Sequence, residues 1–574
     1  MDLYLSVEAL CGRLANVRHD LGRSEIAFLD VSEEGEFGQG HPLWAVNVPY
    51  SRLESVMAAL VPNLRCPVVL IDHGHAVAER AARRLHTLGY ADVRIVEGGV
   101  VAWEREGREL FKGVYVPSKA FGEWLEQRYG TPTLQPDELL ARRARGDDLV
   151  ILDPRTPAEH RVRHVPGARS CPGGELLDRF KDLVSSPDTL VVLACGGRTR
   201  GIVAAEALRQ AEVENPIAAL ADGNHGWLLA GLELEYGALD DQPSPSAEAL
   251  AYGRQRARSL AAKANIPTLD PDTVSQWLAD PTRTTYVLDV RAPRQYEASH
   301  LAGIRNAPGE QLLQATDRWI AVQGARVVLV DEHETSAVQI AYFLRALGWQ
   351  TGVLAGGIAG AHAAGWRLES TRTLSRPINQ VLTADAAAAV HLAVEHAVAS
   401  APEVTATQAA ILIRDGASGW VFDTSADYLR RHPPGSQWAN RAYLGEALAR
   451  AARGEALVLF SSDGHSAHLA AIDLIEAAHR QGAQPNVQVV RGGIEAWAEA
   501  GLHLSPAEPG SLSRDQRVDF LYWAANRRNG DQQAMRNYLA WERQLPLQLQ
   551  RDGSQFAEFV THSPAYPIQG IDQP

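Results

Sequence analysis

Short apolar runs alternate with longer helix-like stretches along most of the chain, and this alternation recurs four times. Each copy reads as a buried strand ending in Asp, then a Val- and Leu-rich strand, a short polar loop and an Ala-rich helix. A last apolar strand runs into Gly-Gly or Asp-Gly, and a segment containing Trp follows. Four segments that match at three places indicate an internal repeat. The aspartates that end the first strands are Asp30, Asp153, Asp289 and Asp423.

The repeat predicts the class of fold. Strands that alternate with helical patterns of about 10–15 residues are typical of a parallel sheet with helices on both faces. A continuous apolar run such as 191–194 suits a strand that is buried on both sides. We therefore expect an α/β protein with four tandem domains, helical linkers and a helical C-terminal tail that becomes irregular from Pro546. The expected boundaries are 1–115, 130–237, 267–370 and 403–505 for the first to fourth repeats, and 510–574 for the tail.

Composition and charge narrow the possible partners. At about 150 residues per domain, a chain of 574 residues suits four domains rather than one. The 55 Lys and Arg and 69 Asp and Glu residues give a net charge of −14, which argues against nucleic acid or a lipid surface as partner. Apolar runs are too short to span a bilayer, and the first ten residues lack the pattern of a signal peptide. We expect a cytoplasmic protein without nucleic-acid or membrane partners.

The loop after the second strand of each repeat is the place to look for chemistry, because ligands on open α/β sheets bind beyond the carboxyl ends of the strands. A single repeat, the second, begins this loop with a thiol. No CxxC pair is present, so the cysteines do not predict a zinc site. The first loop residues are, in order, Asp72, Cys195, Asp331 and Ser461.

The loop 195–200 has the composition of an anion-binding site. Cys195 stands just before a helix, whose N-terminus favours an anion, and Arg198 and Arg200 add positive charge. Both effects predict a thiol pKa lowered toward neutrality. Gly196 and Gly197 allow backbone N–H groups to turn inward. A buried structural cysteine is the alternative, but two nearby arginines do not suit a core.

The second repeat resembles the rhodanese domain, and the whole chain is similar to bacterial proteins built from four rhodanese repeats. The segment with Asp153, Arg155 and Glu159, followed by the run 164–168, is similar to the family's D-x-R…E…H-I-P-G-A pattern. A six-residue loop is similar to that of the sulfur-transferring branch, whereas related phosphatases and arsenate reductases use a loop one residue longer. The resemblance covers roughly 26–110, 149–234, 286–368 and 420–504.

This resemblance implies sheets of five strands and a two-step sulfur transfer. Cys195 would take the outer sulfur of thiosulfate or of a persulfide, and a small acceptor such as cyanide, sulfite or a thiol would remove it. Asp153 and Arg155 would tie the strand end to the surrounding loops. No metal and no organic cofactor is implied. The residues expected to bind substrate are Gly196, Gly197, Arg198, Thr199 and Arg200.

Several alternatives stay open at this point. The other three repeats would be inactive, because Asp72 and Asp331 cannot accept sulfur and Ser461 has no base placed beside it by sequence. The protein could instead be a persulfide carrier that docks with a partner enzyme of thiol or cysteine sulfur metabolism. A hydrolase or reductase acting on phosphate or arsenate is a third hypothesis. The sequence decides neither which arginine faces the pocket nor whether Cys171 is a resolving thiol.

Overall fold

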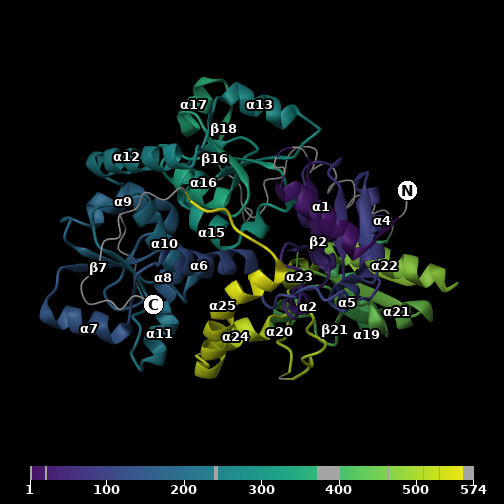
Figure 1. Cartoon of the computed structure of the whole chain (residues 1–574). Coiled ribbons are helices and arrows are strands. Elements are labelled where there is room, and N and C mark those ends of the chain that lie inside the picture. The colour runs from purple at the N-terminus through teal and green to yellow at the C-terminus, as the bar shows by residue number, and fades with distance from the viewer. Residues whose placement is uncertain are drawn as a thin grey trace. The chain divides into compact units, whose positions relative to one another are not determined.

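A computed structural model describes residues 3–19, 22, 24–237, 243–370, 401–462, 464–508, 510–528 and 530–559 (Figure 1). The chain divides into two compact units. Unit 1 comprises Met1–Leu10, Ala27–Val114 and Leu382–Tyr522, and unit 2 comprises Cys11–Ile26, Tyr115–Val381 and Trp523–Pro574. Unit 1 therefore contains the fourth repeat and the first repeat without its residues 11–26, and unit 2 contains the second and third repeats.

The second repeat, in unit 2, is a parallel sheet of five strands. Its two central strands, β9 and β7, are almost completely buried, as expected for apolar runs with helices on both faces. The strand order is β6 (Thr133–Leu134), β10 (Ile217–Leu220), β9 (Leu190–Leu193), β7 (Leu149–Asp153) and β8 (Arg169–Ser170). Its helices are α6 (Val116–Tyr129), α7 (Pro136–Arg145), α8 (Pro157–Val162), α9 (Leu176–Leu183), α10 (Thr199–Gln210) and α11 (Gly223–Leu229).

The third repeat, also in unit 2, has the same strand order. Its sheet runs β11 (Thr268–Leu269), β17 (Gln350–Leu354), β16 (Arg326–Val330), β12 (Thr285–Asp289) and β14 (Arg305–Asn306), all parallel. The short strands β13 (His300–Leu301) and β18 (Leu368–Glu369) pair antiparallel, and β15 covers Val322–Gln323. The linker helix α12 (Ala247–Lys263) packs on α9 and on α16, so it joins the two repeats. The other helices are α13 (Pro271–Ala279), α14 (Pro293–Ala298), α15 (Gly309–Gln314), α16 (Ser336–Ala346) and α17 (Gly357–Ala363).

Unit 1 repeats this architecture twice. The first repeat pairs β1 (Tyr4–Leu5), β5 (Val93–Val96), β4 (Val68–Ile71), β2 (Ile26–Asp30) and β3 (Val46–Asn47) in parallel. The fourth pairs β19 (Glu403–Val404), β23 (Asn486–Val490), β22 (Ala456–Phe460), β20 (Ser418–Val421) and β21 (Gln437–Trp438). The helices of the first repeat in unit 1 are α2 (Glu34–Phe37), α3 (Leu53–Leu60), α4 (Val77–Thr87) and α5 (Gly99–Arg105), while α1 (Val7–His19) belongs to unit 2 from Cys11 on. Those of the fourth are α19 (Ala406–Arg414), α20 (Ser425–Arg430), α21 (Gly445–Ala452), α22 (Ser466–Arg480) and α23 (Gly493–Glu499). The expectation of an α/β protein built from mostly parallel five-stranded sheets is confirmed.

The C-terminal tail corrects one expectation. After α24 (Tyr522–Arg528), α25 runs from Gln532 to Asp552 with Pro546 inside it, whereas the sequence predicted an irregular chain from Pro546. A proline inside a helix removes one backbone hydrogen bond, but burial of one helix face can outweigh that loss. The buried positions of α25 continue past Pro546, and the helix packs against α6 (Figure 1). They are Met535, Tyr538, Leu539, Glu542, Leu545, Pro546 and Leu549.

Within the part of the chain that the structure describes, no helix is both long enough and apolar enough to cross a bilayer. Residues 560–574 of the expected tail lie outside the described residues.

Candidate active site

Cys195 lies where β9 ends and the loop to α10 begins. Its side chain is almost fully buried, with a relative exposure of 2%. The Sγ atom lies 3.3 Å from the carbonyl oxygen of Gly197 and 3.7 Å from that of Arg198, so the neutral thiol can donate to either. The loop therefore closes around the sulfur atom.

The Asp-Gly turn before α11, residues 222–223, packs against the backbone of this loop. Asn224 donates its backbone N–H to the carbonyl of Cys195 over 2.8 Å. Gly223 has a φ of +52°, and a Cβ there would lie 2.2 Å from the Cys195 carbonyl oxygen and 2.6 Å from that of Gly197. Only glycine allows this approach of the two backbones. Gly223, the glycine of the Asp-Gly pair in this repeat, is therefore needed for the shape of the loop.

The pKa of Cys195 differs from the sequence-based expectation. Burial raises the pKa of the thiol, and it outweighs the charges of Arg200 and Arg155 and the backbone hydrogen bonds of Gly197 and Gly201, which all lower it. The prediction of a pKa lowered toward neutrality was wrong because loop composition does not report burial. The cationic and N–H groups that favour a thiolate are nevertheless in place.

Arg198 points into a group of carboxylates. Its Nε atom donates to Glu123 of α6 over 2.7 Å, and its guanidinium also binds Glu126 and, over 3.1 Å, Asp222. Three acidic side chains therefore balance the charge of Arg198. This arrangement ties the loop 195–200 to α6 and to the turn before α11.

Of the two arginines in the loop, Arg200 is the one whose charge lowers the pKa of the Cys195 thiol. Its guanidinium makes two hydrogen bonds of 2.7 Å to Glu159. Burial would raise the pKa of Glu159, but Arg200 overrides it and the pKa falls to about 2. Glu159 is itself placed by the capping box of α8, in which Thr156 accepts from the Glu159 N–H. The start of α8 thereby fixes the position of Arg200.

A small cavity lies beside Arg200, with a volume of about 30 Å³. Pro154 and Gly173 of the second repeat line it together with Glu310 and Gln339 of the third. Burial raises the pKa of Glu310 to about 7. The immediate surroundings of the loop therefore include side chains of the third repeat.

Asp153 and Arg155 form a tight pair behind the loop. Arg155 donates to Asp153 through Nε over 2.9 Å and through a terminal nitrogen over 2.6 Å, and it also reaches the carbonyl of Arg163. His160 adds a hydrogen bond of 2.9 Å to the same carboxylate. Burial alone would raise the pKa of Asp153, but these partners hold it below its ordinary value. The geometry fits the predicted task of tying the strand end to the loops.

Residues of α25 cover the outer side of the loop, although no motif in the sequence assigned them to the site. Glu542, only 1% exposed, accepts hydrogen bonds from Tyr538 over 2.5 Å and from Thr199 over 3.3 Å. Its second carboxylate oxygen and Nδ1 of His225 lie 3.7 and 3.6 Å from the position a Cβ would take on Gly197. Neither atom has a hydrogen-bond partner among the described residues. Burial raises the pKa of Glu542 to about 7 and lowers that of His225 to about 3. The apolar spacing of α25 could have predicted a helix, but not its contact with a loop more than 300 positions earlier.

The corresponding loops of the other three repeats begin with Asp or Ser, where the second repeat has Cys195. Asp72 accepts three backbone hydrogen bonds of 2.8–2.9 Å, from Gly74, Val77 and Ala78. Asp331 accepts three of 2.7–3.0 Å from its own loop and helix. Ser461 accepts a hydrogen bond of 3.2 Å from the backbone N–H of Ala467. The backbone N–H groups of this loop therefore converge on the side chain of its first residue.

None of the four cysteines, all of which the structure describes, forms a disulfide. Cys171 is fully buried, burial raises the pKa of its thiol far above the ordinary value, and its backbone N–H donates to the carbonyl of Asp153. These properties suit a packing residue rather than a resolving thiol. In the part of the chain that is described, no cluster of three or more His, Cys, Asp or Glu side chains could hold a metal ion.

Comparison with known proteins places the chain in a family. The rhodanese-like domain family matches residues 14–106, 135–230 and 270–364. The crystal structure of a thiosulfate sulfurtransferase from Pseudomonas aeruginosa is 36% identical in sequence and superposes with a TM-score of 0.83, covering 97% of this chain and 100% of that one. This chain belongs to the rhodanese family.

Two curated proteins are also similar to this rhodanese. A thiosulfate sulfurtransferase from Azotobacter vinelandii is 25% identical over 220 residues, which cover 32% of this chain and 80% of that protein. An HTH-type transcriptional regulator from Mycobacterium tuberculosis is 36% identical over 102 residues, covering 18% of this chain and 43% of that protein. The chain thus spans less than half the length of the second relative.

Proposed function

We propose that this rhodanese is a sulfurtransferase that uses Cys195 to move sulfane sulfur from thiosulfate or a persulfide to a small thiophilic acceptor. The observation that carries the proposal is the loop 195–201, whose counterparts in the first and third repeats each hold a carboxylate with three backbone N–H groups. Cys195 puts a nucleophile at the position on which the backbone N–H groups of this loop converge. The similarity to two thiosulfate sulfurtransferases supports the same chemistry.

The reaction proceeds in two displacements. In the first, the Cys195 thiolate attacks the outer sulfur of thiosulfate, the S–S bond of the donor breaks, and sulfite leaves with the electron pair. The enzyme then carries a Cys195 persulfide. In the second, cyanide, sulfite or a thiolate attacks the terminal sulfur, and the bond to Sγ breaks to return the electron pair to Cys195. Covalent catalysis of this kind divides one transfer into two easier steps.

The residues around Cys195 take different parts in this scheme. The backbone N–H groups of the loop hold the thiolate and then the terminal sulfur. Arg200 attracts the anionic donor and stabilises the leaving sulfite, a task that suits a planar guanidinium. Arg198 holds the loop against α6, because three carboxylates already occupy it. The cover formed by α25 limits the access of water to the loop.

The other repeats take a supporting part in the proposal. Residues 403–505 form a fourth rhodanese-like domain, which is supported by a sheet with the strand order of the three matched repeats. Asp72, Asp331 and Ser461 leave the first, third and fourth repeats without a sulfur acceptor. The third repeat still contributes Glu310 and Gln339 beside Arg200.

Intact-mass spectrometry tests the function directly. After treatment with thiosulfate, the protein should gain the mass of one sulfur atom, cyanide should remove it, and Cys195→Ser should show no gain. If thiosulfate fails, glutathione persulfide and mercaptopyruvate are the next donors. A failure of all three would overturn the sulfurtransferase proposal. Rapid loading from a partner enzyme combined with slow turnover of thiosulfate would instead favour a persulfide carrier.

A further inference from the structure

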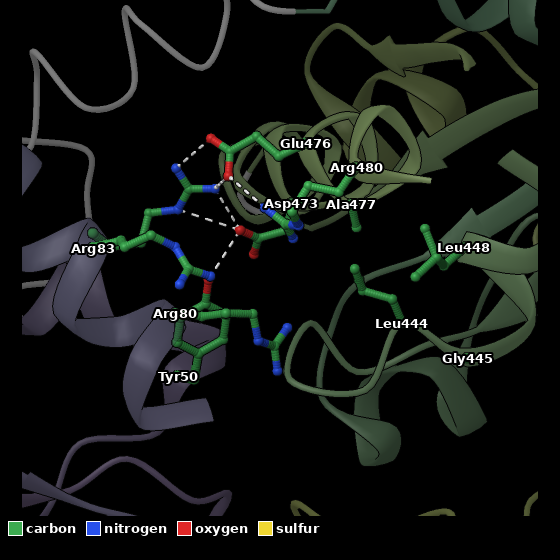
Figure 2. Close-up of a pocket in the computed structure, with 11 residues that line it drawn as sticks. Tyr50, Arg80, Arg83, Leu444, Gly445, Leu448, Asp473, Glu476, Ala477 and Arg480 are labelled. Atoms are coloured by element: carbon green, nitrogen blue, oxygen red, sulfur yellow. Dashed lines mark hydrogen bonds and ion pairs between the residues drawn. The ribbon is translucent and has the colours of Figure 1, made fainter. Parts of the chain in front are cut away.

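A cavity of about 230 Å³ lies in unit 1 between the first and fourth repeats (Figure 2). On one side are Tyr50 and the arginines of α4, and on the other is an apolar wall formed by Leu444, Leu448 and Ala477 (Figure 2). Arg480, at the end of α22, also lines it. A charged side and an apolar side face the same space.

The acidic groups of this region are already paired with two arginines. Arg441 binds Glu54 over 2.5 and 2.7 Å and Asp473 over 2.7 Å. Arg84 binds Asp473 over 2.6 Å and Glu476 over 2.9 Å. Burial would raise the pKa of Asp473, but these cations hold it below its ordinary value, so the carboxylate stays ionised. This buried network joins the two repeats.

Three further arginines leave an excess of positive charge. Arg80 donates to the backbone carbonyls of Arg441 and Ala442 and stacks 4.8 Å from the centre of the Tyr50 ring, so no carboxylate neutralises it there. Arg83 has no ion pair within the described part of the chain. Arg480 comes no closer than 4.0 Å to Glu476.

In and beside the cavity, the five arginines therefore outnumber the three carboxylates of Glu54, Asp473 and Glu476, although the whole chain has a net charge of −14. A local excess of this sign attracts anions from solution. Guanidinium groups suit the planar or tetrahedral oxygens of carboxylates, sulfonates and phosphates.

We propose that this cavity binds a small organic anion, with its charged group toward Arg83, Arg80 and Arg480 and its apolar part against Leu444, Leu448 and Ala477. A dry cavity of about 150 Å³ is large enough for benzene, so the present volume holds one ring and a charged group. The site does not depend on the sulfur-transfer proposal, because its residues belong to unit 1 and Cys195 belongs to unit 2.

Titration calorimetry of the full-length protein with phenyl phosphate tests the proposal. We expect saturable binding of phenyl phosphate, weaker binding of inorganic phosphate and none of neutral benzyl alcohol. Added salt should weaken the binding, since the arginines are partly exposed. Benzoate serves as the carboxylate arm and shows which head group the arginines prefer.

Substitutions of the exposed arginines locate the site. Arg83→Gln and Arg480→Gln should each weaken the binding of phenyl phosphate about threefold to tenfold. Arg414→Gln removes an arginine of the same unit that is 72% exposed and does not line the cavity, and it should leave the affinity unchanged. Thermal unfolding checks that all three variants fold. Absence of phenyl phosphate binding at millimolar concentration, or unchanged affinity in the double variant of Arg83 and Arg480, would overturn the proposal. Cys195→Ser should bind as the wild type does, which separates this site from the sulfur-transfer site.

Discussion

The loops that follow the central strands of the second and third repeats occupy the same place in the fold but begin with different residues, Cys195 and Asp331. Both follow a central strand of a sheet with the same strand order, and both lead into a helix. In the third repeat, the Asp331 carboxylate accepts the N–H groups of Glu334, Thr335 and Ala337. In the second, Cys195 occupies the corresponding position and no carboxylate fills the loop. The third repeat shows that the N–H groups of the loop converge on the side chain of its first residue even where no nucleophile is present.

The side chains around the two loops differ more than the backbones do. Glu334 and Ser336 of the third repeat stand where the second has Arg198 and Arg200. By contrast, the Asp153–Arg155 pair has a close counterpart in the third repeat. Arg291 donates to Asp289 over 3.0 and 2.7 Å and also to the backbone carbonyl of Ser299. Because this Asp–Arg pair is also present in the third repeat, which lacks the cysteine, we infer that it stabilises the conformation of the strand end. We therefore expect sulfur transfer in the second repeat to depend on Cys195 and Arg200.

The largest expected effect comes from converting Cys195 into the residue of the third repeat. Cys195→Asp should abolish both persulfide formation and sulfur transfer, because its carboxylate would occupy the N–H groups and cannot accept sulfur. Cys195→Ser should be equally inactive but should leave the loop without a resident anion. We expect thermal unfolding to show Cys195→Asp at least as stable as Cys195→Ser at neutral pH. Sulfur transfer by either variant above the background rate would contradict the assignment of the nucleophile.

A second large effect should follow from changing the turn that supports the loop. In Gly223→Ala, the new Cβ would meet the carbonyl oxygens of Cys195 and Gly197 at 2.2 and 2.6 Å, at a residue with φ of +52°. Because both obstacles are backbone atoms, we expect a loss of about 3 kcal/mol or more in the free energy of unfolding, together with loss of activity. Urea denaturation measures the first and the thiosulfate assay the second.

Gly146→Ala is the matched control for this substitution. Gly146 has a φ of +75° in the same repeat, but a Cβ there would meet no atom within 4 Å. It should cost about 1 kcal/mol through backbone strain alone and leave sulfur transfer intact. Equal losses in the two variants would show that strain, and not contact with the loop, explains the effect at Gly223.

The sequence predicts the features that are local in the chain and misses those that depend on distant segments. The repeat, the parallel sheets and the position of Cys195 at a strand end follow from apolar spacing and short motifs. The raised pKa of Cys195 does not, because it arises from burial, to which other segments contribute. The contact of Glu542 with Thr199 was equally invisible, since it joins positions 343 residues apart. Likewise, the carboxylates that occupy Arg198 come from α6 and from the turn before α11.

The pH dependence of Cys195 reactivity should shift in opposite directions when Arg200 and Glu159 are replaced. Because the pKa of Cys195 is raised, its alkylation by iodoacetamide should accelerate as pH rises through the alkaline range. Arg200→Gln removes a charge that lowers this pKa, so alkylation at neutral pH should slow about tenfold. Glu159→Gln leaves Arg200 without its counter-charge, so the profile should move in the opposite direction, to lower pH.

The background from the other cysteines is measured in Cys195→Ser and subtracted. Gln can still serve in the capping box of α8, so Glu159→Gln should fold normally. A shift of both variants in the same direction would mean that the Arg200 charge does not control the thiol.

The smallest expected effect is a gain of chemistry in the third repeat. In a Cys195→Ser background, Asp331→Cys places a thiol where backbone N–H groups already converge. The carboxylate of Asp178 interacts electrostatically with the group at position 331, and Ser336 stands where Arg200 would be. We therefore expect a thiol that is alkylated at neutral pH about tenfold more slowly than Cys195 and takes up little sulfur from thiosulfate. Adding Ser336→Arg should raise its reactivity, because the new cation opposes Asp178 and favours the thiolate. A thiol in Asp331→Cys that matches Cys195 without that arginine would show that the backbone of the loop alone suffices, and that the charge of Arg200 is not what separates the second repeat from the third.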